Sequence, residues 1–132
     1  MPDATMIRTH PRVQGAIYDA VSQSVEACVQ ASLVFNQCAD ACLGEADPAG
    51  LVECIRACQD AADVCQAHAR IASRHTGHAQ DLVRTLLQAC VAACRTASEK
   101  LGAHVADRSY CRVCAQACSR CALACQEALT SI

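Results

Sequence analysis

Apolar and thiol side chains recur every three or four residues along four segments of the chain. This spacing predicts amphipathic helices that pack through one face, because an α-helix turns about once every 3.6 residues. No segment shows the two-residue alternation that is typical of a strand. The four predicted helices cover residues of about 12–43, 48–73, 78–101 and 106–129.

Residues that favour helix ends stand between these segments. Gly44 follows the first helix, and Asp47 with Pro48 offers an N-cap and a proline for the first turn of the second. Gly102 is placed to end the third helix, and Asp107 is a candidate cap for the fourth. Short connections make consecutive helices neighbours. The sequence therefore predicts an all-α fold, an antiparallel up-down-up-down four-helix bundle, as one domain over residues 1–132.

Each helix carries cysteine in its apolar stripe. The pattern Cys-x-x-x-Cys occurs at least once in every predicted helix, and the fourth helix has five cysteines at alternating steps of three and four. Leu, Ile or Val would bury more apolar area at these positions, so packing alone does not explain the choice. The pattern predicts a cysteine-lined core in which all thirteen thiols are candidate metal ligands: Cys28, Cys38, Cys42, Cys54, Cys58, Cys65, Cys90, Cys94, Cys111, Cys114, Cys118, Cys121 and Cys125.

Charge and composition exclude several classes of partner. The formal net charge is -2 and the basic residues are scattered, so neither nucleic acid nor a membrane surface is an expected partner. The first residues have no apolar run of signal-peptide length, which favours a cytoplasmic location. Cytosolic thiols are normally reduced, and an odd number of cysteines cannot all pair within one chain. A disulfide scaffold is therefore disfavoured.

The choice of metal follows from thiolate chemistry. Two cysteines four residues apart on a helix point the same way, and soft thiolates select Cu(I), Zn(II) or iron–sulfur clusters. A zinc ion with four thiolates keeps two net negative charges, which is costly in a dry core. Cu(I) needs only two or three thiolates and shares them by bridging, so charges cancel near one ion per cysteine. Charge balance favours many Cu(I) ions in a continuous array.

Three alternatives stay open at this stage: a zinc protein, an iron–sulfur protein, and a dithiol redox protein using Cys111 with Cys114 or Cys118 with Cys121. Iron–sulfur ligands usually come from loops with other spacings. Redox Cys-x-x-Cys pairs belong at an exposed helix N-terminus beside strands, and no strand is predicted here. No arrangement of nucleophile and base or of paired carboxylates stands out, so the protein is not expected to be an enzyme.

Three motifs carry a resemblance to a known family: YCRVCAQACSRCALAC at 110–125, SRHTGHAQ at 73–80 and LLQACVAACRT at 86–96. Over essentially its whole length the chain resembles the bacterial copper storage proteins, in particular their cytosolic branch. The resemblance implies a bundle that stores or detoxifies Cu(I), assembled as a homotetramer. Copper chaperones or efflux components are the candidate exchange partners under this interpretation.

The chain also departs from the cysteine-richer members that it resembles. Ala61, Ala97 and Leu101 occupy stripe positions where cysteine would fit the spacing, and Phe35 stands between Cys28 and Cys42 in the first helix. These residues predict gaps in the metal array. Tyr110 occupies a position where similar proteins are expected to have histidine.

Two histidines are candidates for a role beside the thiols. His104 follows the third helix and lies near Cys111 in sequence, so it is a candidate ligand for copper on its way into the bundle. In an up-down-up-down bundle it shares one end with Cys42 and Cys54, whereas the other end is apolar. His68 lies in the stripe of the second helix, where it is either a ligand or a hydrogen-bonded core histidine.

Overall fold

The computed structural model describes residues 4–9, 15–74 and 80–132. Within these ranges the chain forms five α-helices and one short 3-10 helix, and no strand is present. The elements in chain order are α1 (Ala4–Thr9), α2 (Gly15–Leu43), η1 (Pro48–Leu51), α3 (Val52–Ala72), α4 (Gln80–Leu101) and α5 (Ser109–Ser131).

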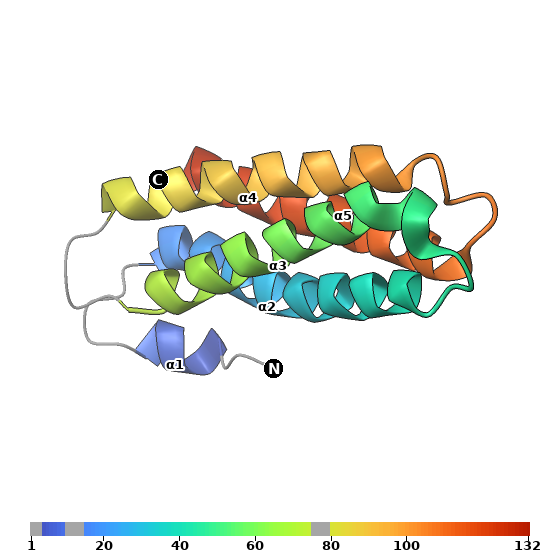
Figure 1. The fold of residues 1–132 in the computed structure, drawn as a ribbon. Coiled ribbons are helices and arrows are strands. Elements are labelled where there is room, and N and C mark those ends of the chain that lie inside the picture. The colour runs from blue at the N-terminus through green and yellow to red at the C-terminus, as the bar shows by residue number, and fades with distance from the viewer. Residues whose placement is uncertain (1–3, 10–14, 75–79) are drawn as a thin grey trace.

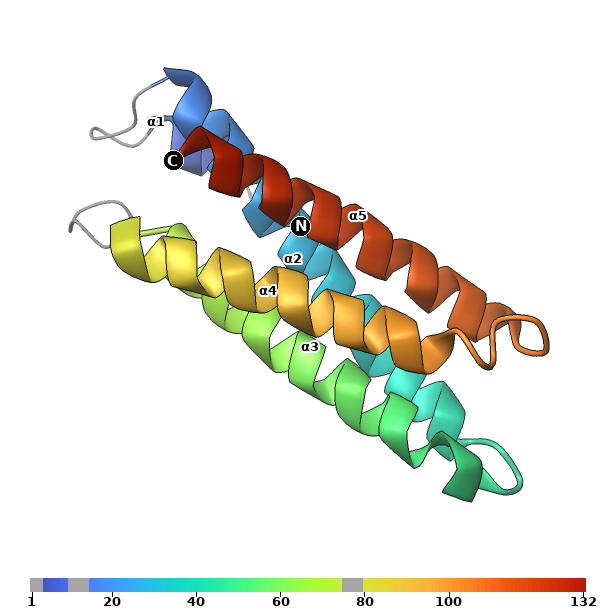
Figure 2. The same ribbon diagram turned by 90° about the horizontal axis from the view of Figure 1, so that it is seen from above.

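The four long helices form the predicted antiparallel bundle. Each packs against two neighbours, in the cyclic order α2, α3, α4, α5 and back to α2 (Figures 1 and 2). At one end α2 and α4 finish while η1, α3 and α5 begin, and we call this the His104 end because residue 104 lies in its α4–α5 connection. At the other, C-terminal end, α2 and α4 begin and α5 finishes (Figure 1).

The helix ends at the first connection lie close to their predicted positions. α2 ends at Leu43, one residue before Gly44. Asp47 caps the next element, because its Oδ1 accepts a hydrogen bond from the backbone N–H of Ala49 at 3.3 Å. Pro48 occupies the first position, as predicted, but the first turn winds as a 3-10 helix before α3 begins. At the other connection of this end, α4 stops just before Gly102.

The predicted start of the last helix at residue 106, with Asp107 as its cap, is wrong. α5 begins at Ser109, and its N-cap is Arg108 in an extended conformation with no side-chain capping bond. The backbone N–H groups of Asp107 and Arg108 instead donate to the carbonyl of His104, so this stretch forms turns. Arg108 Nε also donates to Glu45 Oε1 at 2.6 Å across the connection. This ion pair with Glu45 holds the Arg108 side chain at the connection, and its backbone stays outside the helix.

The six-residue helix α1 is an element that the sequence analysis missed. Within it, the hydroxyl of Thr9 donates a hydrogen bond to the carbonyl of Thr5 at 2.8 Å. The helix packs against α2. A helix this short shows no periodic stripe, so its pattern carried no signal. Residues 12–14 of the first predicted helix, residues 78 and 79 of the third and part of the motif at 73–80 lie outside the described residues.

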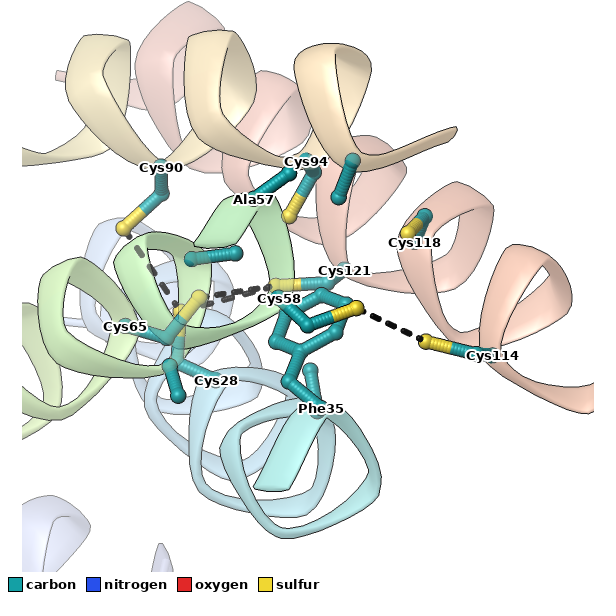
Figure 3. Packing of buried hydrophobic residues seen from close by; sticks show 14 of the residues in the cluster. Cys28, Phe35, Ala57, Cys58, Cys65, Cys90, Cys94, Cys114, Cys118 and Cys121 are labelled. Atoms are coloured by element: carbon teal, nitrogen blue, oxygen red, sulfur yellow. Dashed lines mark hydrogen bonds between the residues drawn. The ribbon is translucent and has the colours of Figure 1, made fainter. Parts of the chain in front are cut away.

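The core lies along the common axis of the four long helices and consists mainly of cysteine and alanine. Large side chains are few in it: Phe35, Leu51, Leu87 and Leu101 are all almost completely buried. Protonated cysteine packs as a small hydrophobe, so the thiols themselves fill the space between the helices (Figure 3). Among the described residues, no helix has the length and apolarity needed to cross a bilayer.

Candidate metal centre

All thirteen cysteines are buried and free of disulfide bonds. Each of the four long helices contributes thiols to the interior, because the steps of three and four residues keep one face of every helix toward the axis. The structure therefore brings every sequence-predicted thiol into the core. What differs among them is the distance from one sulfur to the next.

Five groups of three sulfurs lie within 4.8 Å of one another and are suited to hold an ion. They fall into two sets that share no thiol. The outer cluster, toward the His104 end, contains the groups Cys38–Cys42–Cys111 and Cys38–Cys58–Cys114. The inner cluster, toward the C-terminal end, contains the groups Cys28–Cys121–Cys125, Cys28–Cys65–Cys90 and Cys65–Cys94–Cys121.

Sulfur–sulfur distances in the inner cluster match those of a bridged metal site. Cys28 Sγ lies 3.7 Å from the sulfurs of Cys121 and Cys125 and 3.9 Å from that of Cys90. Cys65 Sγ lies 3.8 Å from Cys121 Sγ. Three thiolates around one ion at about 2.3 Å, the length of a zinc–sulfur bond, would be about 4.0 Å apart. The observed separations need little adjustment to accept an ion.

The outer cluster draws its sulfurs from three helices only. Cys58 Sγ lies 3.9 Å from Cys114 Sγ, and Cys38 belongs to both outer groups. At this level α4 presents Ala97 and Leu101, both fully buried and without a ligand atom. The outer cluster is therefore smaller than the inner one.

Phe35 and Ala61 separate the two clusters along α2 and α3. Phe35 is fully buried on the α2 stripe between Cys28 and Cys38, and its ring points from α2 into the bundle (Figure 3). Ala61 lies on the α3 stripe between Cys58 and Cys65 and is also fully buried. The clusters share no sulfur where these residues stand, which is where the sequence predicted gaps.

Two cysteines, Cys54 and Cys118, belong to none of the three-sulfur groups. Cys54 Sγ donates to the carbonyl of Lys100 at 3.1 Å, which holds this thiol at the side of the outer cluster. Cys118 is buried on α5 between Cys114 of the outer cluster and Cys121 of the inner one. Eleven of the thirteen thiols are thus already grouped in the protein without metal.

His104 lies at its predicted end of the bundle but outside the three-ligand groups. It is half-buried, and its Nδ1 lies 3.4 Å from Nη1 of Arg108, which donates to it. Arg108 is in turn paired with Glu45, whose carboxylate accepts from Arg108 Nε. The histidine therefore sits beside a polar chain of two charged residues at this end of the bundle.

Burial keeps most thiols protonated in the protein without metal. Removal from water disfavours the thiolate and raises the pKa of Cys42, Cys54 and Cys111, the last to about 12. Burying a neutral thiol does not remove a charge from water, so the helices can pack around these cysteines before any ion binds.

Three thiols run against this trend, one in the outer cluster and two in the inner cluster. Hydrogen bonds from Cys114 and Cys38 lower the pKa of Cys58 to about 5 in the outer cluster. In the inner cluster, hydrogen bonds from Cys125 and Cys28 hold the pKa of Cys90 far below its ordinary value. The pKa of Cys121 is raised by its hydrogen bond with Cys125, but hydrogen bonds with Cys28, Cys65 and Cys94 outweigh this and lower it to about 5. Since the thiolate is the form that binds metal, each cluster contains a sulfur prepared for a first ion.

His68 is a fully buried histidine whose tautomer follows from its partner. Its Nε2 lies 2.9 Å from Ser24 Oγ, and that hydroxyl donates its only proton to the carbonyl of Val21 at 2.6 Å. Ser24 must therefore accept, so Nε2 carries the proton and Nδ1 has a free lone pair. Nδ1 has no hydrogen-bond partner among the described residues. Burial lowers the pKa of His68 to about 4, so the ring is neutral.

Ser24, Glu45 and Arg108 are residues near the sites that the sequence analysis did not single out. Ser24 could have been noticed as a polar residue in the stripe of the first helix, one turn before Cys28, whereas nothing in the local pattern pairs Glu45 with Arg108. Tyr110, which stands where histidine was expected, is half-buried with a hydroxyl that has no partner among the described residues.

The donor set restricts the chemistry of the core. Each group contains three sulfurs and none has a fourth ligand within the same distance among the described residues, so a tetrahedral four-cysteine site for a single zinc ion is not prepared. Three-sulfur groups that share Cys28, Cys38, Cys65 or Cys121 suit an ion of low coordination number that accepts bridging thiolates.

Comparison with known proteins agrees with this donor set. The copper storage protein family matches residues 17–130. The structure of the copper storage protein Ccsp from Streptomyces lividans loaded with 10 copper equivalents superposes with a TM-score of 0.93 at 39% identity, covering 98% of each chain.

A second structure from Streptomyces lividans gives the same result. This cytosolic copper storage protein, loaded with five coppers, has a TM-score of 0.86 at 41% identity, over 89% of this chain and 98% of the other. Curated proteins give no match. With a family match over most of its length and an interior of grouped thiols, the chain belongs to the copper storage protein family.

Proposed function

We propose that this protein stores copper in the cytosol by binding many Cu(I) ions through its core thiolates. The observation that carries the proposal is the set of five three-sulfur groups joined through shared cysteines. Shared sulfurs are what bridged Cu(I) requires, and bridging allows charge to cancel as the ions accumulate. The cytosolic location rests on the description of the Streptomyces lividans relative as cytosolic. The role is sequestration rather than catalysis.

Capacity is proposed to be close to one ion per cysteine, which is thirteen thiols. Eleven thiols lie in the grouped sites, and we expect Cys54 and Cys118, which are buried in the same core, to join them as copper accumulates. Each incoming Cu(I) displaces one thiol proton, so the core stays near neutral at every stage of loading. This is the reason that a buried site can hold so many cations.

An anaerobic Cu(I) titration against a competing chelator tests the proposal. We expect saturation near the number of cysteines, with the helical circular dichroism of the reduced, chelator-treated protein unchanged on loading. Saturation at three or four ions, or zinc or iron in freshly purified protein, would favour a different metal. A disordered spectrum without copper would contradict a core of mostly protonated thiols that packs before metal binds.

Copper is proposed to enter and leave at the His104 end. The C-terminal end is lined by buried Val21, Ala72 and Leu87, which a cation would pass only at high cost. His104 offers a half-exposed imidazole, a weaker ligand for Cu(I) than a pair of thiolates, so it would release the ion inward. We expect His104→Ala to slow loading and chelator-driven removal while preserving most of the capacity. Stopped-flow mixing with a Cu(I) chelator measures both rates, and unchanged rates would refute this route.

A homotetramer is the proposed assembly, as the family resemblance implies. Large apolar side chains remain exposed on several helices, including Leu33, Val113 and Leu123, and would be covered by subunit contacts. Sedimentation equilibrium with and without copper measures the assembly directly. Copper chaperones or efflux components are proposed as donors and acceptors, to be sought by transfer of copper from a loaded chaperone to the metal-free protein.

A further inference from the structure

The His68–Ser24 pair lies at the C-terminal end of the inner cluster. His68 follows Cys65 by three residues on α3, and Ser24 precedes Cys28 by four residues on α2, so each is on the thiol-bearing face one turn deeper. Both side chains are fully buried. The pair thus stands where the column of sulfurs ends.

The orientation of the imidazole is set by Ser24. The serine hydroxyl donates to Val21, so it accepts from His68 Nε2 and leaves the Nδ1 lone pair without a partner among the described residues. Buried polar atoms in proteins nearly always have a partner, and an exception calls for an unplaced water or ion or a chemical role. A metal-binding histidine has this same arrangement: one nitrogen free for the ion, the other donating to a fixed acceptor.

We propose that His68 supplies, through Nδ1, a nitrogen ligand to a Cu(I) ion at the C-terminal end of the inner cluster, with Ser24 holding the ring in the required tautomer. The proposal rests on the copper-storage function. The same ion would take its thiolates from the Cys28 and Cys65 side of the cluster, the thiols nearest along the two helices. His68 is a ligand in this proposal and Ser24 a positioning residue.

Charge explains why a nitrogen ligand suits the last site. An ion inside the column has sulfur on both sides and shares bridging thiolates with its neighbours. An ion at the end has no further cysteine beyond it, because the stripes continue with Val21, Ala72 and Leu87. A neutral imidazole completes its coordination without another buried negative charge, and Cu(I) accepts imidazole nitrogen. Burial also keeps the ring unprotonated at neutral pH.

Nitrogen NMR provides a direct test on the unmodified sequence. Two-bond 1H–15N correlation spectra of protein labelled at histidine distinguish a protonated, a free and a metal-bound ring nitrogen. In the metal-free protein we expect the His68 ring as the Nε2–H tautomer with a free Nδ1. On full Cu(I) loading its Nδ1 signal should move to the metal-bound range while Nε2 keeps its proton. An unchanged Nδ1 signal at full loading would overturn the proposal and leave copper storage intact.

The variant His68→Gln assigns the signal and tests capacity. Glutamine places an amide nitrogen near the position of Nε2, so it can still donate to Ser24, but it has no lone pair at the Nδ1 position. We expect a folded protein that binds one Cu(I) fewer than the wild type and lacks the shifting signal. His104→Gln is the matched control and should keep that signal.

Ser24→Ala separates positioning from ligation. Without its acceptor the ring should populate both tautomers in the metal-free spectrum, and the last ion should bind more weakly without being lost. If His68→Gln retains full capacity, Nδ1 faces a buried water rather than copper. If the wild type itself binds no Cu(I), the failure is that of the proposed function and not of this site.

Discussion

The outer and inner clusters use the same residue type in two different arrangements. Sulfurs of the inner cluster come from all four long helices, and its three groups are linked through Cys28, Cys65 and Cys121. The outer cluster lacks a contribution from α4, where Ala97 and Leu101 replace cysteine, and only Cys38 links its two groups. The comparison shows that continuity of a metal core depends on whether every helix supplies a ligand at each level.

The outer and inner clusters also differ in the residues that surround them. The outer cluster adjoins half-buried His104 and the Glu45–Arg108 ion pair, which bring water and charge to that end. The inner cluster adjoins buried His68 and an apolar end. On electrostatic grounds the outer cluster should exchange copper readily and the inner cluster should retain it, because solvent access lowers the cost of moving a cation.

The largest effect is expected from removing the three linking thiols of the inner cluster. The triple variant Cys28→Ala, Cys65→Ala and Cys121→Ala leaves each inner group with a single sulfur. Copper capacity should fall by about five ions, because only Cys90 and Cys125 remain as a facing pair that can hold one ion, and the other remaining thiol is isolated. The three small cavities should cost on the order of 3 kcal/mol in unfolding free energy. Chelator-competition titration and thermal melts measure the two effects.

The matched control changes three outer thiols, Cys38, Cys58 and Cys111, to alanine, which leaves each outer group with a single sulfur. It should reduce capacity by about five ions, the size of the outer cluster, and leave the tightly held fraction of copper in place. A loss of only three ions in both triple variants would show that every thiol binds independently, and the division into two clusters would have no functional meaning.

A smaller effect is expected from joining the clusters with Ala97→Cys. The new thiol would lie on the α4 stripe at the level where that helix now supplies no ligand. Capacity should rise by about one ion, and adding one sulfur to a close-packed site should cost about 1 kcal/mol in the metal-free protein. Ala92→Cys on the exposed face of the same helix is the control. An equal gain in both variants would contradict the requirement for a position in the core.

The smallest effect is expected from Glu45→Gln, which breaks the ion pair with Arg108 beside the outer cluster. Both side chains are about one-third exposed, so solvent screens the pair and the unfolding free energy should change little. Capacity should stay constant while chelator-driven removal accelerates, since Arg108 is no longer held over His104. Glu53→Gln, which breaks the exposed pair with Lys100, is the control and should leave the removal rate unchanged.

Periodicity along the chain was enough to predict the stripes of the bundle. The stripe residues named in the second predicted helix are all buried in the structure: Cys54, Cys58, Ala61, Cys65 and His68. The same holds for the five cysteines of α5. These predictions succeed because a helix repeats every 3.6 residues whatever its neighbours are, so which face turns inward is a local property. Gly44 and Asp47 mark helix ends for equally local reasons.

The sequence by itself thus determined that the chain is all-α and that its thiols face one axis. It also indicated that these thiols are suited to bind soft metal ions. Only the tertiary structure decided which thiols are neighbours. The distance between Cys28 and Cys121 spans two helices and depends on how far each slides along the other, which no local pattern contains. The same long-range packing brings Ser24 to His68 and Glu45 to Arg108. Helix pattern is set by adjacent residues, whereas a metal site is set by the register of helices that lie far apart in sequence.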